Sequence, residues 1–131
     1  MRKIKFLSIA LTLMVALFST SVQAQNITEG VTVVELTQVP GEFHTTSLNL
    51  KPGKYQFTVT NESVDKEVGF VIQTAADKDG DVMKTAYPNS FSKSLIAKGV
   101  TGTSGIVDLP AGEYVYSCPL NATPKYTLTV K

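Results

Sequence analysis

Short apolar stretches alternate with polar turns along the chain from residue 31 onward. Tyr55, Phe57 and Val59 occupy every second position of residues 55–60, which is the spacing of a strand that buries one face. Residues 68–74 form an apolar run that is typical of a central strand. The same criteria predict further strands at 31–37, 44–50, 91–96, 105–109, 113–118 and 126–130.

About seven or eight short strands at this spacing predict an all-β fold, a Greek-key β-sandwich. An immunoglobulin domain of that architecture has a second cysteine and a buried tryptophan. The chain has one cysteine, Cys118, and no tryptophan, so the immunoglobulin class is excluded.

The strand pattern is interrupted between residues 75 and 89. Asp77, Asp79 and Asp81 resemble part of a calcium loop, but the glutamate that closes such a loop and its flanking helices are missing. We therefore predict a solvated turn, followed by a short helix within residues 82–87.

The first residues have the three parts of a cleaved secretory signal. A basic start at Arg2, Lys3 and Lys5 precedes the apolar residues 6–18, and small residues follow up to Ala24. The apolar stretch is shorter than the roughly 20 residues of a membrane-spanning helix. We predict cleavage after Ala24, which leaves residues 25–131 as one β-sandwich domain, located in the periplasm or secreted, with no membrane span.

The charge balance argues against nucleic acid as a partner. The formal net charge of the whole chain is +1, and the predicted signal carries basic residues but no acidic ones. The remaining domain is therefore weakly acidic and contains no arginine. Such a chain has no basic surface for nucleic acid or an anionic membrane.

Two segments resemble the cupredoxin family, and the resemblance covers most of the chain after the signal. Residues 50–61 resemble that family's strand, Pro-Gly turn, strand and asparagine, ending here at Asn61. Residues 109–119 resemble the segment that delivers the copper thiolate, with Cys118 in the ligand position. The resemblance implies a cupredoxin-like sandwich of seven or eight strands with Cys118 at the end of a strand.

The histidine ligands of that family do not carry over. The resemblance places Val68, or Glu67 in a register shifted by one, at the first histidine position. Residues 119–123, where the second histidine is expected, contain no histidine. A type 1 copper site needs two imidazoles and a thiolate, and the chain has a single histidine, His44. We therefore expect no ordinary type 1 copper site and no cofactor, with copper bound in another way as the alternative.

Three residues remain as candidate metal ligands. Cys118 is either a small buried hydrophobic residue or a retained soft ligand for Cu(I). His44 is either an exposed surface residue or its partner, and Met83 lies in the irregular segment. Because short turns reverse the chain, we predict that His44, Asn61 and Cys118 lie at one end of the sandwich.

Two further groups of residues have structural interpretations. Tyr114 follows Leu109 and Pro110 as in a tyrosine corner, whose hydroxyl binds the backbone a few residues upstream. Glu62, Asp65 and Glu67 are interpreted as a solvated surface. We predict no enzyme, because the chain offers no arrangement of nucleophile and base.

Two hypotheses of function follow from this sequence. The first is a binding module that recognises an unknown protein partner through the end of the sandwich that would carry copper. The alternative is a copper-binding or electron-transfer protein that uses Cys118 with His44 or Met83, or a site shared between chains.

Overall fold

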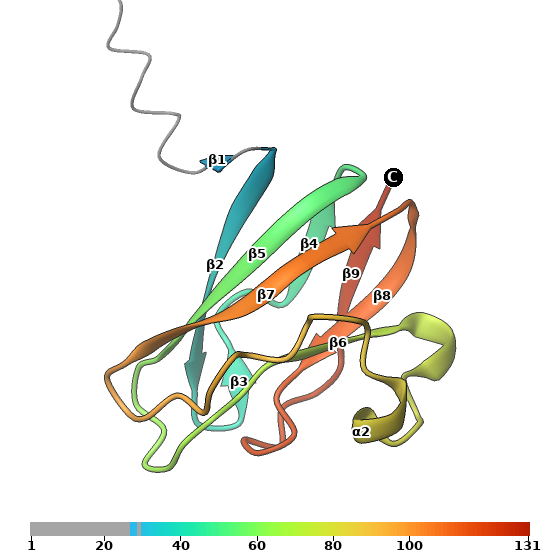
Figure 1. Ribbon diagram of the computed structural model, residues 1–131. Helices are drawn as coiled ribbons and strands as arrows, with labels where there is room; N and C mark the ends of the chain where they lie inside the picture. Colours follow the sequence, from blue (N-terminus) through green and yellow to red (C-terminus); the bar gives the residue numbers. More distant parts are fainter. Residues whose placement is uncertain (1–26, 29) are drawn as a thin grey trace, which may run out of the picture. The chain divides into compact units, whose positions relative to one another are not determined.

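The computed structural model describes residues 27–28 and 30–131. It divides into a segment that ends at Gly30 and contains β1 (Ile27–Thr28), and a unit from Val31 to Lys131 that forms the sandwich (Figure 1). The predicted signal, residues 1–24, and its cleavage site lie outside the described residues. Within the described part of the chain, no helix is long and apolar enough to cross a membrane.

The first sheet of the sandwich places β5 in its centre. β2 (Val31–Val39) pairs with β5 (Gly53–Asn61) in parallel, and β5 pairs with β7 (Thr101–Leu109) in antiparallel orientation. The short β3 (Glu42–Phe43) forms a hairpin with the end of β2. Gln38 near the end of β2 lies opposite Asn61 at the end of β5, so both mark the same end of the sandwich.

The second sheet has the order β4-β9-β8-β6. Its strands are β4 (Ser47–Leu50), β9 (Tyr126–Val130), β8 (Gly112–Ser117) and β6 (Val71–Thr74). From β5 to β8, consecutive strands alternate between the two sheets, so the chain crosses repeatedly from one layer to the other (Figure 1). The prediction of an all-β Greek-key sandwich is confirmed.

Aromatic side chains fill the space between the sheets. Phe57 from β5 stacks on Phe70 with ring centroids 5.2 Å apart, and Phe43 meets Tyr116 edge to face at 5.4 Å. The predicted alternation of β5 is confirmed, because Tyr55, Phe57 and Val59 are all buried. Aromatic contacts in these offset and edge geometries therefore join the two sheets, beside the aliphatic side chains of the same core.

Two tyrosine corners close the turns at the start of β5 and the end of β7. The Tyr114 hydroxyl donates to the carbonyl of Pro110 over 2.7 Å, which confirms the predicted corner. The Tyr55 hydroxyl donates in the same way to the carbonyl of Lys51 over 2.6 Å, and this second corner was not predicted. Gly53 pairs with Leu109, so both corners lie at one end of the sandwich, which we call the corner end.

The predicted strand at residues 91–96 is wrong. Residues 87–96, which we call the crossing segment, instead lie across the edges of both sheets. The N–H of Ser92 donates to the carbonyl of Phe70 beside β6, and the N–H of Lys93 donates to the carbonyl of Thr103 in β7. A segment that binds two different sheets in turn cannot pair along either one. Gly102 permits the close approach, since a Cβ there would lie 2.6 Å from Cγ1 of Ile96.

Several strand boundaries also differ from the prediction, and the largest shift is that of β7, which begins at Thr101 rather than at residue 105. β4 begins at Ser47 rather than at residue 44, because residues 44–46 carry the chain from β3 in the first sheet to β4 in the second. β6 begins at Val71 rather than at residue 68. The apolar run from residue 68 is nevertheless buried, since core burial does not require strand pairing.

The irregular segment forms a 3-10 turn, η3 (Ala75–Asp77), and the predicted short helix, α2 (Val82–Thr85). Asp81 caps α2, because its carboxylate accepts a hydrogen bond from the N–H of Met83 over 2.9 Å. The side chain of Gln73 is fully buried and donates to the carbonyl of Asp77 and the hydroxyl of Thr85. The segment is therefore anchored to β6.

Candidate functional site

Cys118 directly follows β8, and its side chain is fully buried. The N–H of Gly69 donates a hydrogen bond to Sγ over 3.2 Å. The N–H of Cys118 donates to the hydroxyl of Thr123, and its carbonyl accepts from the N–H of Asn121. The loop after β8 is thereby folded back onto Cys118, and the thiol has no contact with solvent. This setting suits both a packing role and a soft-ligand role.

Val68 occupies the position where the resemblance expects the first histidine. It directly precedes Gly69, the donor to the Cys118 sulfur. Its side chain is fully buried in the core, and its backbone exchanges two hydrogen bonds with Ile96, at 2.8 and 3.0 Å. The branched aliphatic side chain supplies packing next to Cys118 and no donor atom for a metal.

Asn121 lies in the loop where the second histidine is expected, and its amide is committed to internal hydrogen bonds. Its carbonyl oxygen accepts from the N–H of Gly41 over 2.9 Å. Its amide nitrogen donates to the side chain of Gln38 and to the carbonyl of Val39. The amide of Gln38 donates in turn to the carbonyl of Gly69 over 2.7 Å. A buried polar network of side-chain amides thus connects the end of β2 with both segments that contact Cys118.

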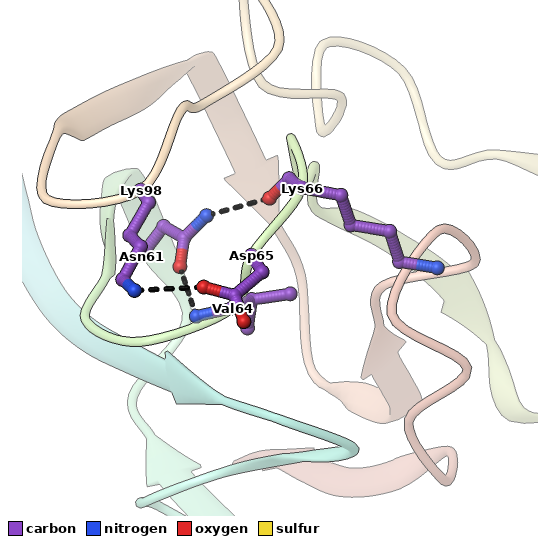
Figure 2. Close-up of polar contacts among 5 residues, drawn as sticks. All are labelled: Asn61, Val64, Asp65, Lys66 and Lys98. Carbon is purple, nitrogen blue, oxygen red and sulfur yellow. Dashed lines mark hydrogen bonds and ion pairs between the residues drawn. The ribbon is translucent and has the colours of Figure 1, made fainter.

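Asn61 fixes the neighbouring loops, as Figure 2 shows. Its side-chain oxygen accepts from the N–H of Val64, and its amide nitrogen donates to the carbonyl of Lys66. The same nitrogen also donates to the carbonyl of Ile96. Asp65 points outward and forms an ion pair of 2.7 Å with Lys98, which holds the pKa of that carboxyl below its usual range. Glu62 and Glu67 are also exposed. The three acids form the solvated surface that was predicted.

His44 lies at the same end of the sandwich as Asn61 and Cys118, but its side chain faces solvent. Its backbone N–H donates to the carbonyl of Thr37, one residue before Gln38. Phe43 beside it points into the core, and neighbours along an extended segment point in opposite directions. The exposed imidazole and the fully buried thiol of Cys118 therefore lie in different environments.

Met83, the third candidate ligand, projects from α2 and is 75% exposed. Among residues 30–131, the structure gathers no group of three or more His, Cys, Asp or Glu side chains that could hold a metal ion.

An apolar groove of about 530 Å³ lies near Cys118. Its walls come from α2, from the crossing segment, from residues 69–70 and from the loop after Cys118. It contains four of the exposed large hydrophobic side chains of the described unit, namely Met83, Phe91, Leu95 and Leu120. Clustered exposed apolar side chains of this kind mark binding surfaces more often than isolated ones do.

The groove lies directly beside the candidate metal position. Gly69, which binds the Cys118 sulfur, and Pro119, which follows Cys118, both line it. The sequence did not predict this groove. Phe91 and Leu95 were assigned to a strand, and Leu120 was noted only because it lies where the second histidine ligand was expected. The signal in the sequence was that Phe91 and Leu95, two residues of the crossing segment, are large and apolar.

No protein-family model matches the chain, and no curated protein matches it. Solved structures do. Auracyanin B has 21% identity and a TM-score of 0.59, over 81% of this chain and 92% of its own. Auracyanin A, a "blue" copper protein from the green thermophilic photosynthetic bacterium Chloroflexus aurantiacus, has 17% identity and a TM-score of 0.61, over 78% of this chain and 100% of its own. The dithionite-reduced auracyanin from Roseiflexus castenholzii has 16% identity and a TM-score of 0.55, over 76% of this chain and 96% of its own.

The fold of this chain is that of a cupredoxin, as the motifs around residues 50–61 and 109–119 implied. At these identities the likeness establishes the architecture and leaves the chemistry to the residues themselves.

The donor atoms of the chain do not fit the type 1 copper site of that fold. Such a site takes two imidazole nitrogens and a thiolate in one plane. The whole chain contains one histidine, and its imidazole is exposed while Val68 and Asn121 lie beside Cys118. The fold and the donor set therefore disagree at this end of the sandwich.

Proposed function

We propose that the protein is an exported binding module of cupredoxin-like fold that recognises its partner through the groove beside Cys118. The observation that carries this proposal is the gathering of Met83, Phe91, Leu95 and Leu120 around one hollow. A volume of about 530 Å³ falls within the range of about 300–1,000 Å³ that ligand pockets occupy. No enzymatic activity forms part of the proposal.

The walls of the groove are held in place by hydrogen bonds. This favours binding, because a preformed wall loses little conformational entropy when the partner binds. The crossing segment binds β7 through the N–H of Lys93 and the edge of β6 through the N–H of Ser92. The loop after Cys118 is fixed by the amide of Asn121, which binds Gly41 and Gln38. These hydrogen bonds thus support a preformed binding surface at this end of the sandwich.

A neutral fluorescent dye such as Nile red tests the groove directly. We expect the dye to bind the purified protein and Leu95→Asp to weaken binding by at least about tenfold, because a carboxylate is poorly tolerated in an apolar hollow. The matched control is Ile106→Asp. Ile106 is exposed to a similar degree, 42% against 54% for Leu95, but does not line the groove. Equal effects of the two variants, or no binding by the parent, would overturn the proposal.

A second candidate function is Cu(I) binding through Cys118, with His44 or Met83 as a further ligand or with a site shared between chains. It is favoured by the thiol at the end of β8 and by the auracyanin neighbours, one of which is described as a blue copper protein. Copper binding that is lost in Cys118→Ser and reduced in His44→Ala would establish this candidate. Unchanged binding in both variants would remove it.

Cu(II) separates the binding module from an ordinary blue copper protein. We expect no strong visible absorption band when the monomer receives Cu(II), since that geometry needs two imidazoles. A strong band from a protein of verified monomeric mass would contradict the proposal.

A further inference from the structure

The apolar groove beside Cys118 contains a single charged residue. Lys93 lies in its wall between Ser92 and Ser94, and no acidic residue lines it. The ion pairs found among the described residues use other lysines, Lys54 and Lys98. The groove therefore combines a mostly apolar lining with one lysine in its wall, and that lysine has no carboxylate partner among the described residues.

The position of Lys93 is fixed by its backbone. Its N–H donates to the carbonyl of Thr103 in β7 over 2.7 Å, and Ser92 on one side binds the carbonyl of Phe70. Phe91 and Leu95 flank these polar residues and supply apolar surface within the same wall. The backbone that carries Lys93 is thus fixed, while its exposed side chain is free to reach a ligand in the groove.

We propose that the groove binds a small amphiphilic anion, an unbranched apolar chain with a terminal carboxylate of the fatty-acid class. This inference rests on the proposed function and names the ligand of that same groove. The apolar lining contacts the hydrocarbon chain, and the ammonium of Lys93 pairs with the carboxylate, assisted by the hydroxyls of Ser92 and Ser94. Pockets for such ligands are mostly apolar and contain a few polar groups that set the orientation.

A second copy of the chain fits this groove less well. A symmetric dimer buries the same surface of both partners, so the two Lys93 side chains would enter one interface. The groove lining contains no acidic residue to pair with them. Like charges brought together in an interface oppose association, whereas a monocarboxylate neutralises the lysine.

The test compares two ligands of equal chain length that differ in charge. Dodecanoate, kept below its critical micelle concentration, and dodecan-1-ol each compete with Nile red for the purified protein. We expect dodecanoate to bind roughly three- to tenfold more tightly than the alcohol, because a partly exposed charge-assisted hydrogen bond contributes modestly. Lys93→Gln is expected to remove this preference by weakening dodecanoate alone, and Lys93→Glu to reverse it.

Matched variants separate this inference from the proposed function. Lys98→Gln changes an exposed lysine outside the groove and is expected to leave the preference intact. If both ligands bind equally and Lys93→Gln changes neither, the fatty-acid inference fails while the binding module stands. If Nile red itself does not bind, both fail. A dimer in sedimentation experiments that Leu95→Asp converts to monomer, without dodecanoate binding, would overturn the inference in favour of self-association.

Discussion

The hydrogen bonds that close the two ends of the sandwich differ in how far apart the bonded residues lie in the sequence. At the corner end, the hydroxyls of Tyr55 and Tyr114 each bind a carbonyl four residues upstream. At the Cys118 end, the bonds that involve Gln38 join residues separated by 31 and 83 positions in the sequence. The corner end therefore depends on two local turns, whereas the Cys118 end exists only when both sheets have come together.

This difference predicts how each end responds to mutation. A local bond can form in a turn before the sheets meet, and its loss leaves the neighbouring turn unaffected. Bonds in a shared network depend on each other, so that one deletion leaves several buried groups without partners. We expect large and coupled losses at the Cys118 end, and small and additive losses at the corner end.

The largest effect is expected for Asn61→Ala. The substitution removes three hydrogen bonds and leaves the N–H of Val64 and the carbonyl of Lys66, both drawn in Figure 2, without their partner. The carbonyl of Ile96 loses one of its two donors and keeps the N–H of Val68. We expect the free energy of unfolding to fall by about 3 kcal/mol in urea denaturation. Lys98→Ala serves as the control from the same loops and should leave stability unchanged, because its ion pair with Asp65 is exposed to solvent. Equal losses in both variants would contradict the role given to Asn61.

Gln38→Ala and Asn121→Ala test the coupling within the buried network. Each is expected to lower the free energy of unfolding by about 2 kcal/mol, because each leaves buried partners unsatisfied. The double variant should lose about 1 kcal/mol less than the sum, since the bond between the two amides is removed by either change. Strict additivity in a double-mutant cycle would show that the two amides act independently.

Tyr55→Phe and Tyr114→Phe test the corner end. Each deletes one hydroxyl and one hydrogen bond, so we expect a loss of about 1 kcal/mol per variant. The two hydroxyls share no acceptor, and the losses should therefore add within about 0.5 kcal/mol. A strong coupling between the two corners would contradict the contrast drawn between the ends.

The ionisation of Tyr116 is expected to have the smallest effect on stability at neutral pH, because it changes the free energy of unfolding only at alkaline pH. Burial, together with the nearby Tyr126, raises the pKa of Tyr116 to about 12, whereas an unfolded tyrosine ionises near pH 10. Between these values only the unfolded chain loses the proton, so stability falls as the pH rises from about 10 to 12. Tyr116→Phe should flatten this part of a stability-against-pH curve. The same slope in parent and variant would assign the loss to other groups.

Most of the corner end could be predicted from sequence because its signals are local, although the corner formed by Tyr55 was not predicted. The turn at Pro52 and Gly53 and the spacing from Pro110 to Tyr114 each lie within a few residues, and the alternation of β5 identifies its buried face. Cys118 was placed correctly at the end of its strand for the same reason, since a motif of consecutive residues carried it.

The groove could not be predicted because its walls come from distant parts of the chain. Phe70, Met83, Leu95 and Leu120 meet only after the crossing segment has joined the two sheets. The apolar residues of that segment had the spacing of a strand, and only tertiary contact showed that Ile96 is buried while Leu95 remains exposed. The orientation of His44 was open for a similar reason, because it follows from the neighbouring Phe43, whose burial against Tyr116 is a tertiary contact.

The crossing segment has a consequence for the behaviour of the protein at high concentration. It occupies backbone groups along the outer edges of β6 and β7, which would otherwise offer unpaired N–H and carbonyl groups to another chain. Exposed strand edges are templates for edge-to-edge polymerisation. Residues 87–96 thus cover two strand edges as well as forming a wall of the groove. A substitution that loosens them is expected to cause aggregation during expression or storage.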